Sequence, residues 1–324
     1  MVDDSGYDRQ AADWSARMTA SAPGKIILFG EHAVVYGRPA LAVPVTEVRA
    51  TASVQRSTDP GVWLEAPVIG LRAELSCLPQ DHPLAAAVRS VFSTLDIETP
   101  PDCVIHVDST IPVASGLGSG AAVSVAVIRA LAAYLGHRLP DERVSALAYE
   151  IEKLHHGTPS GIDNTVITYA QPVYFVRGQA MERLQVGAPF TLVIGNSGIP
   201  APTKESVGDV RRLWEADPPR WEKVFDQIAD IVRRARELIE NGAWRGLGKL
   251  MDTNHALLQE LTVSSEALDR LVEAARRAGA LGAKLSGGGR GGNMIALVER
   301  QNAPVVAEAL LAAGATQTMI TQVD

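Results

Sequence analysis

Short apolar runs bounded by glycine, proline or polar residues dominate the first third of the chain, a pattern that predicts β-strands. The run KIILF at 25–29, for example, lies between Pro23-Gly24 and Gly30. We expect strands at 25–29, 40–45, 48–54 and 104–107, with a helix at 84–95. Residues 121–135 are apolar nearly all round a helical wheel, which predicts a buried helix. Asp141 is placed to cap a second helix that runs to about 155.

The second half of the chain is dominated by long helical patterns between short strands. We expect strands at 172–176, 190–194, 283–285 and 294–298, helices at 219–241, 243–261, 265–278 and 302–313, and a final strand. Strands interleaved with helices in both halves predict an α+β protein. A chain of 324 residues suits two domains. We place the boundary near 185, which gives a tail at 1–18, a domain at 19–185 and a domain at 186–324.

Composition narrows the functional classes. Hydrophobic residues make up 46% of the chain and aromatic residues only 5%, so aliphatic cores between helices and sheets are expected. The net charge of −7 argues against nucleic acid as a partner, and no polybasic tract favours a membrane surface. Cys77 and Cys103 form no CxxC pair, the first twenty residues lack a signal-peptide pattern, and a reducing cytoplasm fits both observations.

Three segments are rich in glycine, at 24–37, 115–120 and 286–292. Each one alone would be explained by tight turns. The segment at 115–120 is different, because small residues there lead directly into the long apolar helix. Backbone N–H groups at a helix start, supported by the helix dipole, bind anions. Ser115 and Ser119 add hydroxyl groups, so this segment predicts a site for a polyphosphate.

Other phosphate, hydrolase and metal motifs are absent from the sequence. No GxxxxGK[ST] or GxSxG pattern occurs, and the histidines show no HExxH spacing. A GxGxxG pattern at 287–292 precedes a predicted strand, whereas the dinucleotide fingerprint opens a helix. Walker-type ATPases, α/β-hydrolases, zinc enzymes and Rossmann dehydrogenases are therefore disfavoured.

Two carboxylates stand on either side of a predicted chain reversal at 157–161. Glu152 lies on the second helix and Asp163 follows the reversal, so both can reach one site. Mg²⁺ bound to ATP takes one or two protein carboxylates besides phosphates and waters. Taken alone, Glu152 would more often be a solvated helix residue and Asp163 a turn former. Lys25 is either a solvated strand residue or a cation that steadies charge on a phosphate.

Several motifs resemble those of the GHMP small-molecule kinases. Residues 23–37 (PGKIILFGEHAVVYG), 112–122 (PVASGLGSGAA) and 284–292 (KLSGGGRGG) match the three family motifs in order. HGTPSGIDN at 156–164 and GEHAVV at 30–35 most resemble the mevalonate kinase branch. The resemblance covers about residues 23–298. It implies two α+β domains, the first similar to the second domain of ribosomal protein S5 and the second ferredoxin-like.

The resemblance also implies roles for individual residues. Asp163 matches the catalytic aspartate, Lys25 the lysine paired with it, and Glu152 the Mg²⁺-binding glutamate. The residues expected to bind ATP phosphates are Pro112, Ser115, Gly116, Leu117, Gly118, Ser119, Gly120 and Ala121. The residues expected at the mevalonate site are Lys25, Glu31, His32, Asp163, Thr203, Gly287, Gly288 and Arg290. Thr203 belongs to a stretch, 196–207, that is similar to a substrate-side loop of the family.

Two positions depart from the family pattern. Gly120 replaces the second serine that usually follows GLG, so Mg²⁺ would rely on Glu152, Ser119 or water. Arg290 replaces a glycine of the third motif and either contacts a substrate anion or points to solvent.

The implied activity is ATP-dependent phosphorylation of mevalonate at its 5-hydroxyl. The alternatives are another GHMP acceptor (phosphomevalonate, the mevalonate 3-hydroxyl, a sugar or homoserine) and a nucleotide-binding regulator without catalysis. A homodimer is compatible with the sequence, which leaves the oligomeric state open.

Overall fold

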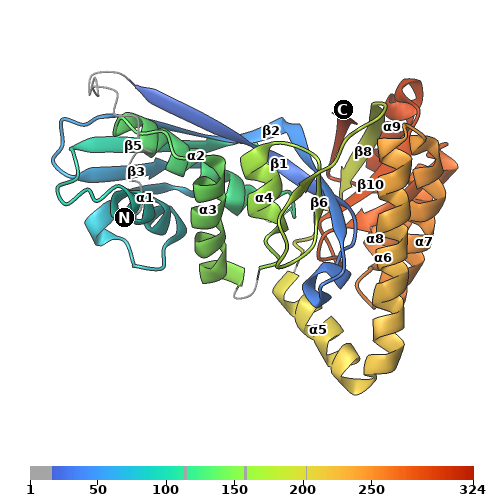
Figure 1. The fold of residues 1–324 in the computed structure, drawn as a ribbon. Helices are drawn as coiled ribbons and strands as arrows, with labels where there is room; N and C mark the ends of the chain where they lie inside the picture. The colour runs from blue at the N-terminus through green and yellow to red at the C-terminus, as the bar shows by residue number, and fades with distance from the viewer. Residues whose placement is uncertain (1–16, 113–114, 157–158, 202) are drawn as a thin grey trace. The chain divides into compact units, whose positions relative to one another are not determined.

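The computed structural model describes residues 17–112, 115–156, 159–201 and 203–324 (Figure 1). Most of the expected tail at 1–18 lies outside these residues. Helices and strands alternate through the chain, which confirms the predicted α+β class. Contacts within the chain form two compact units, each built from three segments. Among the described residues, unit 1 comprises those up to Gly24, Val48–Ile111 and Gly118–Tyr169, and unit 2 comprises Lys25–Glu47, Pro112–Leu117 and Ala170–Asp324.

Two long paired strands, β1 (Met18–Phe29) and β2 (Ala40–Arg56), each contribute residues to both units. The prediction of separate strands at 40–45 and 48–54 is wrong, because β2 is continuous. The polar residues Thr46 and Glu47 are exposed, and the backbone stays extended through them. The two polar residues on the strand surface therefore resembled the polar residues of a turn in the sequence pattern.

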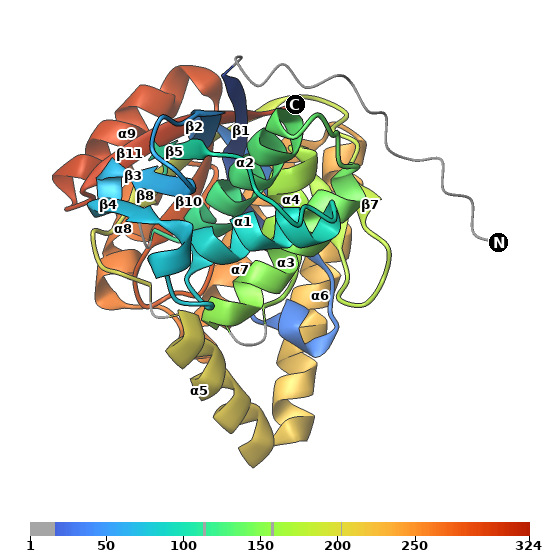
Figure 2. The same cartoon turned by 90° about the vertical axis from the view of Figure 1, so that its left-hand side faces the viewer.

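Unit 1 is a sheet covered by helices. Its strand order is β4-β3-β5-β2; β2 pairs antiparallel with β5, and β3 pairs parallel with β5. Helix α2 packs on β5 and contacts the other three helices, which gather around it in Figure 2. The elements are β3 (Val62–Ala66), β4 (Leu71–Glu74), β5 (Cys103–Ser109), α1 (Pro83–Thr94), α2 (Ser119–Tyr134), α3 (Asp141–His156) and α4 (Ile162–Tyr169).

Helix α2 is buried on most of its surface, as its composition predicted, since alanine lets neighbouring helices approach from several sides. Strands β3 and β4 and helix α4 were not predicted. Helix α4 has only eight residues and several are β-branched, so its own propensity for helix is weak. Packing against α2 and α3 stabilises it. Asp141 begins α3 rather than capping it from outside, and its carboxylate accepts a hydrogen bond from Arg129.

Unit 2 contains an antiparallel sheet with strand order β11-β8-β10-β9. Helices α7, α8 and α9 pack on this sheet, and α6 packs on α7 and α5 (Figure 1). The elements are β8 (Phe190–Asn196), β9 (Gly282–Ser286), β10 (Asn293–Val298), β11 (Gln317–Val323), α5 (Thr203–Ala216), α6 (Pro218–Glu240), α7 (Leu247–Glu260), α8 (Glu266–Arg277) and α9 (Ala303–Ala312). Two short strands, β6 (Val173–Phe175) and β7 (Glu182–Arg183), extend from the first half of β2.

Short 3₁₀ turns complete the fold: η1 (Ala33–Tyr36), η2 (Pro67–Ile69), η3 (Leu75–Cys77), η4 (Trp244–Gly246) and η5 (Arg300–Asn302).

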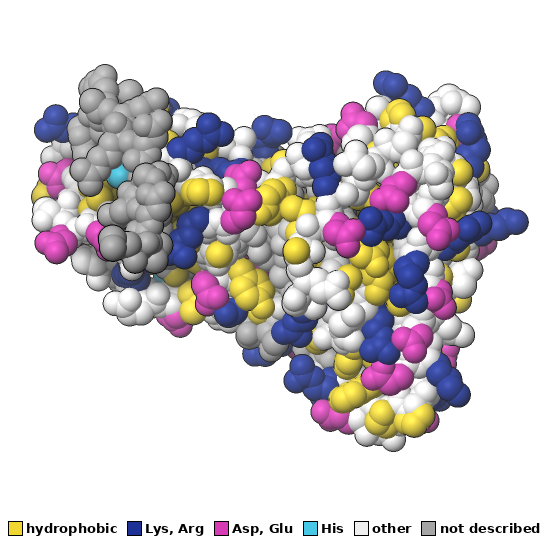
Figure 3. Space-filling model, viewed as in Figure 1, with side chains coloured by type: hydrophobic (Ala, Val, Ile, Leu, Met, Phe, Trp, Pro, Cys, Tyr) yellow, Lys and Arg dark blue, Asp and Glu magenta, His cyan; other side chains and the backbone are white. Residues whose placement is uncertain are grey.

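The helices of unit 2 carry charges of both signs on their surface, and in Figure 3 acidic and basic side chains are interspersed over α6. Arg233 pairs with Asp230 and Arg234 with Glu237 along that helix. Within the described ranges, no helix combines the length and the apolar character needed to cross a membrane.

Candidate functional site

In unit 1, the phosphate-site prediction falls on the start of helix α2. Gly118, with φ of 76°, precedes the first helical residue, Ser119, and no side chain caps this end in the described structure. The amide of Ala122 is the first to bond back, to the carbonyl of Gly118. The amides of residues 119–121 are therefore oriented along the helix axis as an anion site requires.

The two predicted carboxylates lie on neighbouring helices of unit 1. Glu152 lies on α3 and is only 8% exposed, whereas Asp163 lies in the first turn of α4 and is half-buried. Helix α4 is attached to α3 by Asn164, whose side-chain amide donates to Ser145 Oγ at 2.9 Å. Ser160 Oγ accepts from the amide of Ile162 at the start of α4. Asp163 is thus held on a short but anchored helix; residues 157–158 of the predicted reversal lie outside the described residues.

In unit 2, hydrogen bonds join the three glycine-rich motifs. The backbone amide of Lys25 donates to the carbonyl of Leu117 at 3.0 Å, which links the first motif to the second. The Lys25 side chain itself is buried. His32 Nε2 lies 3.1 Å from the carbonyl oxygen of Gly288, which links the first motif to the third. Segments widely separated in the sequence are therefore fixed to one another within this unit.

His32 is neutral at physiological pH. Burial lowers its pKa to about 4; the carbonyl of Gly288 opposes this shift, and the charges of Arg290 and Lys284 add to it. Because a carbonyl only accepts hydrogen bonds, Nε2 carries the proton and donates it to Gly288. Nδ1 then presents a lone pair. The backbone of His32 has φ of 61°, which is uncommon for a residue with a side chain.

Glu31 is almost completely buried and forms an ion pair that sequence analysis did not anticipate. Lys284 Nζ donates to Glu31 Oε1 and to the carbonyl of Leu285, the latter at 2.6 Å. Burial lowers the pKa of Lys284, and the Glu31 carboxylate opposes that shift. The signal was available: Lys284 is the only charged residue in the otherwise apolar or small strand β9. A lone cation in a buried strand indicates a buried partner.

Two acceptor atoms beside each other in sequence remain unused. Glu31 Oε2 and His32 Nδ1 are buried and make no hydrogen bond with any residue that the structure describes. Buried acceptors without donors are unfavourable unless a ligand or water satisfies them. The pair therefore fits a ligand that supplies hydrogen-bond donors, such as a hydroxyl group.

The remaining predicted substrate residues cluster around the third motif. A Cβ atom at Gly288 would lie 2.7 Å from Thr203 Oγ1, so glycine is required for this close approach. Thr203 begins helix α5, and the prediction that 196–207 is a loop is wrong from that residue onward. Gly287 lies at φ of 88° with open space on its Cβ side among the described residues.

Arg290 has a specific structural partner. Its Nη1 donates to the carboxylate of Asp209 on α5, and its backbone amide donates to the carbonyl of Val263 at 2.7 Å. Of the two alternatives left by the sequence, a side chain that simply points to solvent does not describe this pairing. Arg290 stays a candidate for substrate binding only as a prediction.

No group of three or more histidine, cysteine or acidic residues positioned for a metal occurs in the ranges that the structure describes. Glu152 is nonetheless a buried carboxylate on the helix next to Asp163, and it is the donor type that Mg²⁺ prefers. A magnesium ion that is held chiefly by nucleotide phosphates needs only one or two such ligands. The residues present therefore fit Mg²⁺ bound together with a nucleotide better than a resident metal.

Acidification from pH 7 to pH 5 is expected to reduce the free energy of unfolding by about 2 kcal/mol for each of two buried histidines. Besides His32, burial lowers the pKa of His255 to about 4; Asp269 opposes the shift, and Arg276 and Lys284 add to it. Unfolded histidine titrates near 6.5, so between pH 6.5 and pH 4 the unfolded chain binds more protons and gains stability relative to the folded one.

Urea unfolding of the wild type and of His255→Gln at both pH values checks this expectation. His255 Nδ1 accepts from the amide of Leu285, so its Nε2–H donates to Asp269. The variant lacks the titrating group and is expected to lose about half of the pH dependence. Equal pH dependence in the two proteins would show that His255 is not held neutral.

Comparison with known proteins gives consistent matches. The family model for the GHMP kinases N terminal domain matches residues 84–171, and the model for the GHMP kinases C terminal domain matches residues 235–316. The mevalonate kinase of Thermococcus sibiricus is 37% identical over 316 residues, covering 92% of this chain and 94% of that protein.

Solved structures show the same likeness. The crystal structure of L. major mevalonate kinase in complex with R-mevalonate superposes with a TM-score of 0.83 at 28% identity, covering 98% of this chain and 99% of that one. Methanococcus jannaschii mevalonate kinase gives a TM-score of 0.82 at 26% identity, covering 95% of this chain and 98% of that one. The two-domain α+β fold expected from the motifs is confirmed.

Proposed function

Because the chain belongs to the GHMP kinase family, we propose that it transfers the γ-phosphoryl group of ATP to the 5-hydroxyl of mevalonate, a step of isoprenoid precursor synthesis. The observation that carries the proposal is the 37% identity to a mevalonate kinase across nearly the whole length of both chains. The assignment of residues 19–185 to nucleotide binding and 186–324 to the C-terminal kinase domain belongs to the same proposal.

The proposed reaction is an in-line displacement at the γ-phosphorus. The 5-hydroxyl oxygen forms a bond to phosphorus as the bond to the ADP oxygen breaks, and Asp163 accepts the hydroxyl proton. Phosphoryl transfer passes through a loose transition state, so positioning and charge stabilisation contribute more than the base. Lys25 and the backbone amides of residues 116–121 are assigned to stabilise the transferred charge.

Substrate recognition is assigned to the acceptor pair of unit 2. Glu31 Oε2 and neutral His32 Nδ1 are both acceptors, and the 3-hydroxyl of mevalonate, which is not phosphorylated, supplies one donor to this pair. Thr203, Gly287, Gly288 and Arg290 line the adjoining part of the proposed substrate site. This arrangement supports an acceptor that carries a hydroxyl group besides the one that is phosphorylated, because an acceptor without such a donor would leave both buried lone pairs unsatisfied.

Mg²⁺ belongs to the proposal as a companion of ATP. Glu152 would hold it with the hydroxyl of Ser119, since Gly120 offers no side chain. When bound, the ion would neutralise phosphate charge and orient the phosphates. All other steps are assigned to protein groups.

Glu152→Gln is expected to raise the Mg²⁺ concentration needed for half-maximal activity by about 10-fold or more, because the amide offers a weaker, uncharged ligand. Mg²⁺ titrations at saturating ATP measure the effect. Glu150→Gln is the matched control, since Glu150 lies on the same helix but is exposed and pairs with Lys153. An unchanged titration for Glu152→Gln would assign the metal to other ligands.

A screen of acceptors tests the function itself. ADP release is followed with mevalonate, phosphomevalonate, galactose and homoserine, and phosphorus NMR of the product identifies the hydroxyl that was phosphorylated. The proposal expects mevalonate to be preferred and modified at the 5-position. The proposed function would be contradicted by preferred turnover of another acceptor, by modification of mevalonate at the 3-hydroxyl, or by no turnover with any acceptor.

A further inference from the structure

We propose that Asn293 is a positioning residue that fixes the phosphate loop, defined as residues 115–118, through the backbone carbonyl of Ser115. The inference rests on the proposed function, because it assigns that loop to ATP. Asn293 Nδ2 donates to Ser115 O at 2.6 Å, across 178 positions of sequence. Asn293 is 2% exposed and Ser115 is 4% exposed, so the bond is shielded from water.

Asn293 itself is immobilised by the sheet. It begins β10, an interior strand, and is in register with Asn196 on β8 and Ser286 on β9. The other five residues of β10 are apolar and buried. A side chain anchored in this way transfers the rigidity of the sheet to the carbonyl that it contacts.

The loop is held on both sides of its exposed glycine. Asn293 binds the carbonyl of residue 115 and the amide of Lys25 binds that of Leu117, whereas Gly116 between them has φ of 84° and open space on its Cβ side among the described residues. Ser115 Oγ also donates to the carbonyl of Pro112 at 2.8 Å. The two anchored carbonyls therefore restrict the peptide groups of Gly116, the residue free to approach a phosphate.

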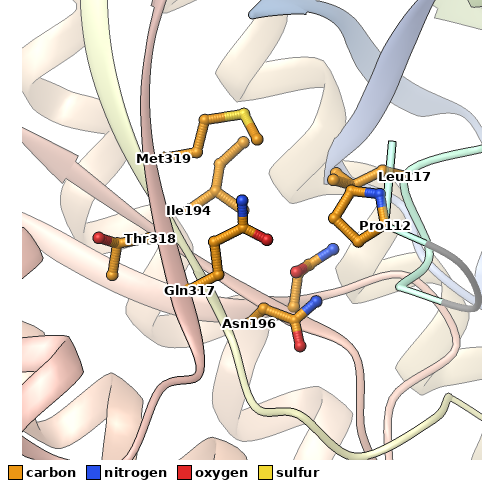
Figure 4. A pocket seen from close by; sticks show the side chains of 8 residues that line it. Pro112, Leu117, Ile194, Asn196, Gln317, Thr318 and Met319 are labelled. Atoms are coloured by element: carbon orange, nitrogen blue, oxygen red, sulfur yellow. The ribbon is translucent and has the colours of Figure 1, made fainter. Parts of the chain in front are cut away.

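The setting of Asn293 argues against a purely stabilising role. Its Oδ1 is buried and makes no hydrogen bond with the part of the chain that the structure describes. A half-satisfied amide is a poor way to stabilise a core. Asn293 lines a small pocket in which Pro112 and Leu117 face Gln317 and Met319 (Figure 4). Pro112, which precedes the loop, and Leu117 within it thus lie against the sheet at this point.

Asn293→Ala removes the donor, and Asn293→Asp keeps the shape but turns a carboxylate oxygen towards the carbonyl of Ser115. Both are expected to weaken ATP binding about 10-fold, because the loop must be ordered when the nucleotide binds; a factor of 10 corresponds to about 1.4 kcal/mol. The KM for mevalonate is expected to change less than about twofold, since the loss is confined to one substrate.

Asn302→Ala is the matched control. Asn302 also lies in unit 2 and donates from its side chain to two backbone carbonyls, those of Ala278 and Gly279. It is expected to lose stability without any change in nucleotide affinity. If Asn293→Asp fails to fold, Asn293→Ala alone decides the matter, with thermal unfolding confirming its folded state.

Nucleotide affinity is measured by calorimetry without acceptor, separately from turnover of mevalonate. A folded Asn293→Ala variant with wild-type affinity for ATP would contradict the proposed positioning role of Asn293. Equal losses of affinity for ATP and for mevalonate would contradict it as well. Wild-type protein that binds ATP but does not turn over mevalonate would overturn the proposed function, and the calorimetric comparison would still decide the role of Asn293. Wild-type protein that does not bind ATP would overturn both.

Discussion

Asp163→Asn is expected to lower kcat with mevalonate by about 10²- to 10⁴-fold while the affinity for ATP changes little. The amide keeps the size of the carboxylate but cannot accept the hydroxyl proton. Because the transition state is loose and most stabilisation comes from positioned charges, the lower part of this range is the closer expectation. Steady-state kinetics with mevalonate and calorimetry with ATP provide the two measurements.

Asp141→Asn is the control for Asp163→Asn. Both aspartates lie in the first turn of a helix of unit 1, where a negative charge interacts favourably with the helix dipole. Asp141 also accepts a hydrogen bond from Arg129, so each substitution is expected to cost some stability, but only the change at Asp163 should affect kcat. Full activity of Asp163→Asn would remove this residue from the mechanism, and an equal loss in Asp141→Asn would point to the folding of unit 1.

The features that could be predicted from sequence are those encoded locally. The long helices of unit 2 follow uninterrupted periodic patterns, and α6 was predicted at 219–241 and found at Pro218–Glu240. The small residues of 115–118 similarly indicate a loop that precedes a helix, although α2 begins at Ser119 and the prediction placed its start at 121. Within unit 2 the contacts of His32 with Gly288 and of Lys25 with Leu117 bring the predicted motifs together.

The features that were missed depend on partners far away in the chain. Lys284 and Glu31 are 253 positions apart, so neither residue alone indicates that both are buried. Asn293 follows the third motif directly, but its role becomes visible only through its contact with Ser115. Helix α4 was missed for a related reason, since its own propensity for helix is weak and packing against α2 and α3 stabilises it. Tertiary burial therefore decided what local propensity left open.

Lys284→Met is expected to reduce the free energy of unfolding by about 3–5 kcal/mol. Lys284 is fully buried and Glu31 is 1% exposed, so removing the ammonium leaves a carboxylate without its counter-charge in the protein interior. The centroid of the Phe29 ring lies 5.9 Å from Lys284 Nζ, and this ring offers no hydrogen-bond donor that could replace the ammonium beside Glu31. Urea unfolding at pH 7 measures the loss, and activity is not the readout because Glu31 belongs to the proposed substrate site.

The double variant Glu31→Gln/Lys284→Met distinguishes a lost charge pair from lost packing. If the unpaired carboxylate is the cause, neutralising Glu31 in the Lys284→Met background should restore much of the stability, because neither remaining side chain carries a charge. Lys249→Met is the matched control, since Lys249 is exposed on α7 and its replacement should change stability by no more than about 0.5 kcal/mol. A loss below about 1 kcal/mol in Lys284→Met, or a double variant no more stable than the single one, would contradict a buried ion pair between the first and third motifs.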